Sequence, residues 1–167
     1  MRNNYYLGAL LILAADQLTK WAAALELPDH PVELIPGYLR LSYVSNSGVA
    51  FGFLAGHDSA WKPYVLAALA VVALVVIFIY GRRMPPGRRL LQWALAVTMG
   101  GILGNFVDRI LRGYVIDFIE FHIQDSFYWP NFNVADSAIT IGIALLLIDT
   151  VQNPAEDAAE PGAGRMA

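Results

Sequence analysis

The stretch that decides the fold is PYVLAALAVVALVVIFIY, residues 63–80, which runs without a single charged side chain. About 20 apolar residues in a helix span the ~30 Å hydrocarbon core of a bilayer. A helix buried in a soluble core is the alternative interpretation, but the uninterrupted length favours a membrane span. The whole chain agrees, because 57% of its 167 residues are hydrophobic and only 15% are charged, against about 45–50% and about 25% in soluble domains.

Three further apolar stretches flank this one. Together they predict a mainly α membrane protein with four transmembrane helices, at about residues 5–25, 63–80, 90–109 and 134–151. We expect one integral membrane domain over residues 1–152, followed by a disordered tail at 153–167 that is rich in Ala, Glu, Pro and Gly. A cleaved signal peptide is the alternative at the N-terminus. It is disfavoured because the apolar run continues past Asp16 and Lys20 without an A-x-A site before them.

The placement of Lys and Arg predicts the orientation. The loop GRRMPPGRR, residues 81–89, has four arginines and no acidic residue, and such loops lie on the cytoplasmic side. Arg2 agrees with a cytoplasmic N-terminus. Four spans then place the C-terminus in the cytoplasm as well, and the two long connections, residues 26–62 and 109–133, outside.

The two outer connections differ in character. In GYLRLSYVS, residues 37–45, apolar and polar side chains alternate, which predicts a short amphipathic sheet. Gly48, Gly52 and Gly56 follow and favour a turn or a close backbone approach. We also expect an outer interfacial loop or short helix on this side of the membrane. The second connection is rich in aromatic residues, and an interfacial aromatic belt is favoured for most of them: Phe118, Phe121, Phe127, Tyr128, Trp129 and Phe132.

Composition also narrows the chemistry. The chain has no cysteine, so thiolate nucleophiles and Cys-ligated metals are excluded. Its three histidines, His30, His57 and His122, lack the spacing of a zinc site. No basic stripe of the kind that binds nucleic acid is present. We therefore expect no metal, no cofactor and no nucleic-acid partner.

Polar side chains gather at one depth, when depth is measured at 1.5 Å per helical residue. This group, near the outer boundary, consists of Asp16, Lys20, Asn46, Asn105, Asp108, Arg109, Asp117, Asn133 and Asp136. Asp16 and Lys20 lie one helical turn apart and can pair; for them, and for Asp108 and Arg109, structural support is favoured over direct chemistry. Asp149 lies at the other end, where an interfacial carboxylate needs no special explanation.

Asp136 is harder to explain structurally, because its apolar helix offers no cationic neighbour in sequence. Asp117 lies at the same depth. Two carboxylates held together at a low-dielectric boundary share a proton, and this gives a general base beside a general acid, as in aspartic proteases. The asparagines could orient substrate amides or the aspartates, or join helices by hydrogen bonds.

Intramembrane carboxylates also serve proton or cation pathways, so the residues alone leave a peptidase and a transporter open. A transporter requires a carboxylate path across the membrane, whereas residues 63–80 are wholly apolar. A non-catalytic scaffold would not require two aspartates at matched depth.

Five ordered blocks carry a resemblance to a known family. They are DQLTK (16–20), NSGVAFGF (46–53), GNFVDR (104–109), GYVIDF (113–118) and FNVADSAI (132–139). In these blocks, on four helices, the chain resembles lipoprotein signal peptidase (signal peptidase II), the bacterial aspartic membrane peptidase. Where the family often has NxGAAF, this chain has Val49 in place of the first alanine, a small change that affects packing at most.

The resemblance implies a catalytic dyad of Asp117 and Asp136. Supporting or substrate-binding roles are implied for Asp16, Lys20, Asn46, Gly48, Asn105, Asp108, Arg109 and Asn133. The implied reaction removes the signal peptide from diacylglyceryl-modified prolipoproteins, before the lipidated cysteine, at the outer face of the bacterial inner membrane. An extracytoplasmic β-cradle, contact with membrane lipids, sensitivity to the cyclic peptide globomycin and independence of metals and cofactors are implied as well.

Overall fold

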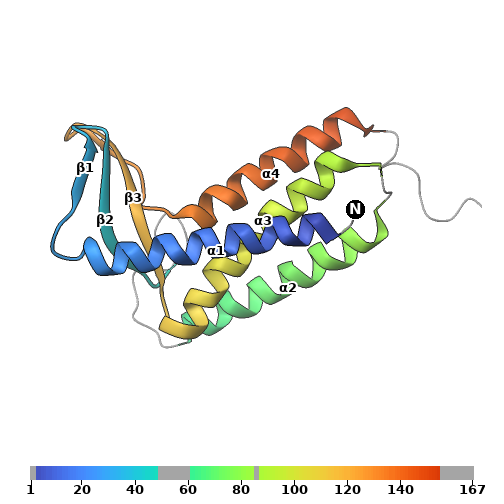
Figure 1. Cartoon of the computed structure of the whole chain (residues 1–167), viewed down its shortest axis with the longest axis horizontal. Coiled ribbons are helices and arrows are strands. Elements are labelled where there is room, and N and C mark those ends of the chain that lie inside the picture. The colour runs from blue at the N-terminus through green and yellow to red at the C-terminus, as the bar shows by residue number, and fades with distance from the viewer. Residues whose placement is uncertain (1–2, 49–60, 85–86, 155–167) are drawn as a thin grey trace, which may run out of the picture.

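The computed structural model describes residues 3–48, 61–84 and 87–154, which form four long helices and a small antiparallel sheet (Figure 1). The helices are α1 (Asn3–Glu26), α2 (Lys62–Arg83), α3 (Arg89–Arg112) and α4 (Val134–Gln152). Each covers one of the four apolar stretches and differs from its predicted ends by at most three residues.

Three of the described helices, α2, α3 and α4, are long and apolar enough to cross a membrane. The helix α1 has 24 residues, but Asp16, Gln17 and Lys20 interrupt its apolar run and it does not meet the same criterion. The structure thus supports three of the four predicted spans, and the fourth stays a prediction.

In contrast to a soluble helical bundle, large apolar side chains lie on the outside of this bundle and charged side chains are buried within it. Large apolar residues of α2 face outward, with Leu69, Val72 and Val76 each about 60% exposed, while Asp16 and Lys20 of α1 are fully buried. Contiguous exposed apolar surface of this size marks contact with another apolar phase. The distribution is that of a bundle surrounded by lipid.

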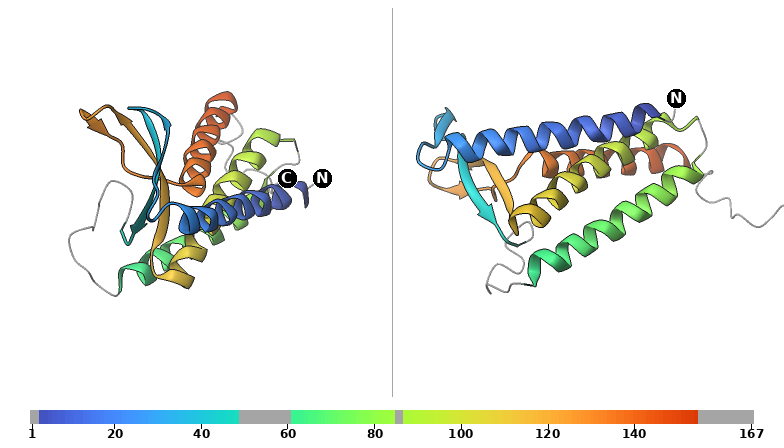
Figure 2. Two further views of the ribbon diagram at one scale, coloured as in Figure 1. Left: turned by 60° about the vertical axis from the view of Figure 1, so that its left-hand side comes forward. Right: turned by 60° about the horizontal axis from the view of Figure 1, so that its bottom comes forward.

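The helix α3 lies at the centre and packs against α1, α2 and α4 (Figure 2). Two glycines allow this close approach. A Cβ added at Gly101 would lie 2.4 Å from the carbonyl oxygen of Ala135, and one at Gly104 would lie 2.4 Å from Oδ2 of Asp16. Small residues at helix contacts let membrane helices approach closely, and here they bring polar groups of α1, α3 and α4 together.

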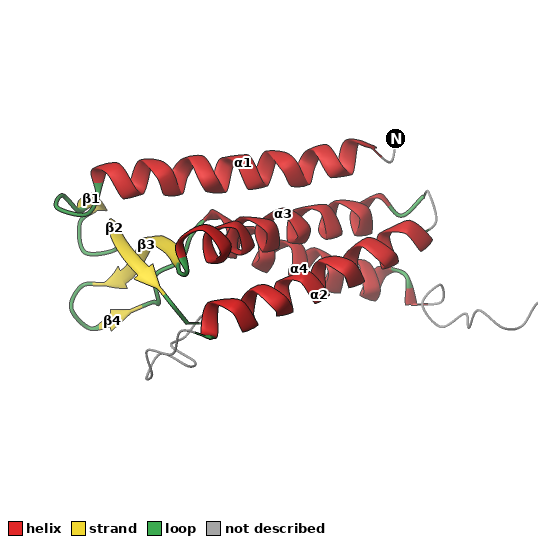
Figure 3. Ribbon diagram, turned by 90° about the horizontal axis from the view of Figure 1, so that it is seen from below, coloured by secondary structure: helices red, strands yellow, loops and turns green. Residues whose placement is uncertain are grey.

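The sheet lies at one end of the bundle (Figure 3). It consists of β1 (Val32–Ile35), β2 (Leu39–Asn46), β3 (Val115–Ile123) and β4 (Phe127–Tyr128), in that order and all antiparallel. The alternating stretch is β2, which confirms the predicted sheet. The N-terminal end of α1 and the C-terminal end of α4 lie together at the opposite end of the bundle (Figure 1).

The second outer connection contains strand β3, which the sequence did not predict, and residues 115–118 of this strand are buried. Phe118 packs with Ala23 of α1 and with Leu27, the residue that follows this helix, so Phe118 does not belong to an aromatic belt. Phe127 and Trp129 are about 45% exposed and fit the belt interpretation. The strand was missed because its partner β2 lies about 70 residues earlier and leaves no local signal.

Asp149 also differs from expectation. It is only 3% exposed and forms an ion pair with Arg88, just before α3, at the end of the bundle away from the sheet. The Asn153 side chain also donates a hydrogen bond to the main-chain oxygen of Asp149. This carboxylate therefore joins two helices and is not merely interfacial.

Some predictions fall outside the described residues. They concern residues 49–53 of the NSGVAFGF block, including Val49 and Gly52, together with Gly56 and the tail from residue 155 onward. A short helix anywhere within residues 49–60 is untested for the same reason.

Candidate active site

Two aspartates from different elements line one cavity of about 490 Å³ at the sheet end of the bundle. Asp117 lies on β3 and is 2% exposed. Asp136 is in the first turn of α4. The remaining lining residues include Asn46, Asn105, Arg109, Trp129, Phe132, Ser137 and Thr140. The predicted pair, nineteen residues apart in sequence, therefore shares the wall of one cavity.

A short link holds Asp117 close to α3. The helix ends at Gly113, whose φ of 77° is the left-handed conformation that glycine adopts without strain. Strand β3 begins two residues later. Its pairing with β2 sets Val44 opposite Asp117 and brings Asn46 to the carboxylate, where Asn46 Nδ2 lies 2.8 Å from Asp117 Oδ2.

Burial, together with the neighbouring charge of Asp136, raises the pKa of Asp117 to about 6, against the lowering effect of hydrogen bonds from Asn46 and Asn133. Desolvation disfavours the charged form of a carboxyl group. A carboxylate with this pKa binds and releases a proton near neutral pH, as a general acid or base requires.

Asp136 is held by the start of its own helix. Asn133 is the N-cap of α4, and its Oδ1 accepts a hydrogen bond from the Asp136 N–H at 2.9 Å. In return, Oδ2 of Asp136 accepts from the Asn133 N–H at 3.3 Å, which completes a capping box. The same Asn133 donates through Nδ2 to Asp117 Oδ1 at 2.7 Å. One buried asparagine therefore bridges the two carboxylates.

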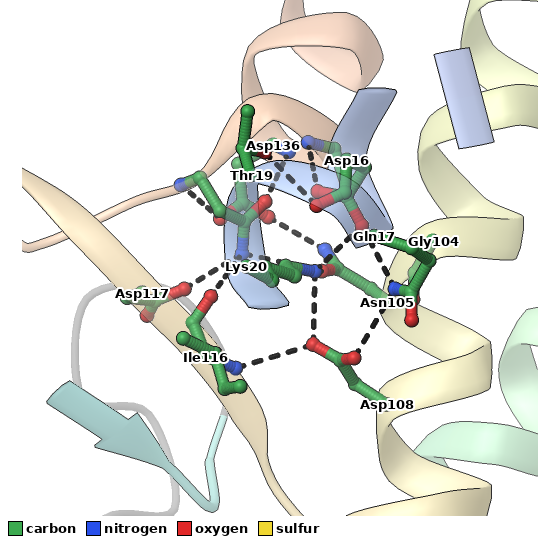
Figure 4. Close-up of polar contacts among 12 residues, drawn as sticks. Asp16, Gln17, Thr19, Lys20, Gly104, Asn105, Asp108, Ile116, Asp117 and Asp136 are labelled. Carbon is green, nitrogen blue, oxygen red and sulfur yellow. Dashed lines mark hydrogen bonds and ion pairs between the residues drawn. The ribbon is translucent and has the colours of Figure 1, made fainter. Parts of the chain in front are cut away.

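A buried cation lies behind the pair (Figure 4). The ammonium of Lys20, which is 0% exposed, is 2.9 Å from Asp16 Oδ2 and 3.0 Å from Asp108 Oδ2. It also donates to Asn105 Oδ1 at 2.8 Å. The predicted pairing of Asp16 with Lys20 is confirmed, and Asp108 adds a second carboxylate from α3.

These groups also tie the helices to one another. Oδ1 of Asp16 accepts from the Ala135 N–H of α4 at 2.8 Å, and Oδ2 of Asp108 accepts from the Ile116 N–H of β3 at 3.2 Å. Each carboxylate is thus paired with a cation and also satisfies a buried backbone donor, which is the condition under which buried ion pairs are tolerated.

The structure brings all ten predicted site residues into one continuous set of contacts. Gly48 joins through its N–H, which donates to Asn46 Oδ1 at 2.9 Å. Arg109 joins through Nη1, which lies 3.2 Å from the main-chain oxygen of Asn105, and it also lines the cavity. The geometry places these residues together; their roles in the reaction remain proposals.

One residue of this set was missed from the sequence. Gln17 donates through Nε2 to Asp16, Asp108 and the Gly104 carbonyl, at 3.1–3.2 Å. It stands inside the DQLTK block, between the two charged residues that drew attention. A polar amide at that depth in an apolar helix was the available signal.

A family model described as signal peptidase (SPase) II matches residues 8–152 of this chain. The chain belongs to the signal peptidase II family. Curated relatives in this family are each named lipoprotein signal peptidase. The protein from Symbiobacterium thermophilum is 43% identical over 145 residues, which cover 86% of this chain and 91% of the relative. The protein from Acinetobacter baylyi is 41% identical over 150 residues, or 89% and 82% of the two chains.

Two solved structures of bacterial membrane enzymes share this fold. The chain is similar to a bacterial membrane enzyme with a TM-score of 0.79 and 30% identity, over 95% of this chain and 93% of the other. A second bacterial membrane enzyme structure gives a TM-score of 0.77 over 90% and 94%. The fold, the peptidase family and the membrane setting are thus established together.

Proposed function

We propose that this protein is an aspartic endopeptidase that removes the signal peptide from diacylglyceryl-modified prolipoproteins and cleaves on the N-terminal side of the lipidated cysteine. The observation that carries the proposal is the pair Asp117 and Asp136, bridged by Asn133 and lining one cavity. The family name supplies the class of substrate, and the carboxylate pair supplies the chemistry.

In the proposed mechanism the dyad shares one proton. The ionised carboxylate accepts a proton from a water molecule whose oxygen attacks the scissile carbonyl carbon. The protonated carboxyl group donates its proton to the carbonyl oxygen, and a tetrahedral intermediate forms. When the C–N bond breaks, the departing amine receives a proton from the dyad, and one hydroxyl of the intermediate returns a proton to the dyad as the new carboxyl group forms. The proton belongs to the pair and not to either residue.

The walls of the cavity suit a substrate that arrives from the bilayer. Ile139, Thr140 and Ile141 of α4 contribute to the lining, and Ile141 is 55% exposed on the outer surface of the helix. A substrate whose acyl chains lie against α4 would therefore bring its peptide to the carboxylates while the chains stay in an apolar environment. This supports a site at interface depth, where a lipid-anchored peptide presents its scissile bond.

The remaining parts of the proposal concern location and partners. We place the protein in the bacterial inner membrane as one integral domain with four spans and both termini cytoplasmic, because the described arginines of residues 81–89 lie at the end of the bundle away from the sheet. The N-terminal end of α1 and the C-terminal end of α4 lie at this same end (Figure 1). The active site then faces outward, membrane lipids surround the helices, and globomycin is the expected inhibitor.

The test is cleavage of a lipidated prolipoprotein by purified protein, with and without globomycin. Asp117→Asn and Asp136→Asn are each expected to abolish cleavage while the protein stays folded. Asp125→Asn, the same substitution at an exposed position of the turn between β3 and β4, is the matched control and should retain activity. Full activity in either dyad variant would refute the proposal.

A further inference from the structure

The three asparagines at the dyad share one feature: each turns its amide carbonyl oxygen toward a group that can only donate a hydrogen bond. For Asn46 the donor is the Gly48 N–H, and for Asn133 it is the Asp136 N–H, each at 2.9 Å. For Asn105 it is the Lys20 ammonium at 2.8 Å, and the Asn133 side-chain amide donates to the same oxygen at a longer 3.3 Å. Backbone N–H and ammonium groups have no acceptor lone pair. Flipping any of these amides would therefore set an NH₂ group against another donor.

The consequence is that only N–H groups of this shell face the two aspartates. Asn46 and Asn133 donate to the two oxygens of Asp117, at 2.8 and 2.7 Å. Asn105 donates to Asp136 Oδ1 at 2.8 Å, and the Asn133 N–H donates to its Oδ2. Such donors stabilise carboxylates in their ionised form. A proton held by the dyad therefore finds no acceptor on these three asparagine side chains.

Lys20 is the one charged group among the donors that fix the amides, since the others are two backbone N–H groups and the Asn133 amide. Its three N–H bonds are used by Asp16, Asp108 and Asn105. It is fully buried and does not belong to the lining of the cavity. Lys20 is linked to Asp136 through Asn105, which forms a hydrogen bond with each of them.

We propose that Lys20 is a positioning residue for the dyad, and that its ammonium group fixes the Asn105 amide so that only N–H faces Asp136. The inference rests on the proposed function of Asp117 and Asp136. It differs from a purely structural role, in which Lys20 would only neutralise Asp16 and Asp108, because the effect must pass through Asn105.

A double-mutant cycle separates the two roles, with kcat and KM measured on lipidated prolipoprotein for Lys20→Met, Asn105→Ala and the combined variant. Lys20→Met should lower kcat about tenfold to hundredfold, the range for losing one hydrogen bond to a charged group, and leave KM unchanged. The combined variant should be no slower than Asn105→Ala, because Lys20 has nothing left to position.

Two further variants distinguish a loss of catalysis from a loss of folding. Arg88→Met breaks the buried pair with Asp149 at the far end of the bundle and should lower thermal stability without changing kcat of the folded protein. Asp108 also forms an ion pair with Arg112. If Lys20→Met does not fold, the cycle is run on the Asp108→Asn background, in which the remaining charges of Asp16 and Arg112 cancel once Lys20 is replaced.

An unchanged kcat in Lys20→Met, or losses that multiply in the combined variant, would overturn the positioning role. Those outcomes leave the proposed function standing as long as Asp117→Asn and Asp136→Asn are inactive. Activity in the dyad variants would overturn both, so the two failures are distinguishable.

Discussion

Asn133 offers a sharp test of the site, because a single buried side chain performs two separable tasks. Its Oδ1 caps α4 and its Nδ2 donates to Asp117. Serine is a good N-cap residue and accepts the same backbone hydrogen bond, but it is too short to donate across to β3. Asn133→Ser should therefore keep the cap and lose the bridge, whereas Asn133→Ala loses both.

The magnitudes follow from these contacts. Loss of a helix cap costs about 1 kcal/mol of stability, so Asn133→Ala should be less stable than Asn133→Ser by about that amount. Loss of a hydrogen bond to a charged carboxylate is worth ~1.5–3 kcal/mol. Because the lost Asn133 amide stabilises the ionised form of Asp117, the pKa of Asp117 should rise above its value of about 6 in both variants. The acidic limb of the activity profile should move to higher pH in both.

The assay is kcat/KM for cleavage of a lipidated prolipoprotein across pH 4–9, together with thermal unfolding of each variant in detergent. The two variants should share one displaced pH profile and differ in unfolding temperature. A wild-type pH profile in Asn133→Ser would show that the bridge to Asp117 has no influence on catalysis, and the reasoning would fail.

Two other predictions concern the wild-type profile and the helix packing. In the wild-type protein, kcat/KM should fall as pH drops through about 6, since burial raises the pKa of Asp117 to that value and a second proton on the pair removes the general base. A limb near pH 4 would contradict this. Gly104→Ala should lower stability by about 1–3 kcal/mol, because the new Cβ would lie 2.4 Å from Asp16 Oδ2. Gly81→Ala, whose Cβ would meet only Leu95 at 3.6 Å, is its control in the same thermal unfolding experiment and should show no comparable loss.

The sequence was sufficient for features that depend on local pattern. Apolar length located the four helices, and alternation located β2. Matched depth paired Asp117 with Asp136 without any knowledge of their contacts, because position along a membrane helix converts directly into distance from the interface. This inference is available for membrane helices because the bilayer gives them a common reference plane, which the helices of a soluble protein lack.

Features that depend on distant partners were not accessible. Strand β3 pairs with β2 across some 70 residues, and its buried aromatic Phe118 was assigned to an interface because nothing nearby marks a strand partner. Asp149 was dismissed for the same reason, since Arg88 lies 61 residues away. Lys20 could be paired with Asp16 by spacing alone, but its contacts with Asn105 and Asp108 require the packing of α1 on α3.

The two-residue link between α3 and β3 has a mechanical consequence. Asp117 is tethered to the end of α3, and Asp136 sits in the first turn of α4, so the separation of the two carboxylates follows the register of one helix against the other. Sliding α4 along α3 would displace the dyad by the same amount. Bilayer thickness, which acts on that register through the length of apolar surface it must cover, thereby becomes a determinant of turnover, and lipids of different chain length are a direct way to vary it.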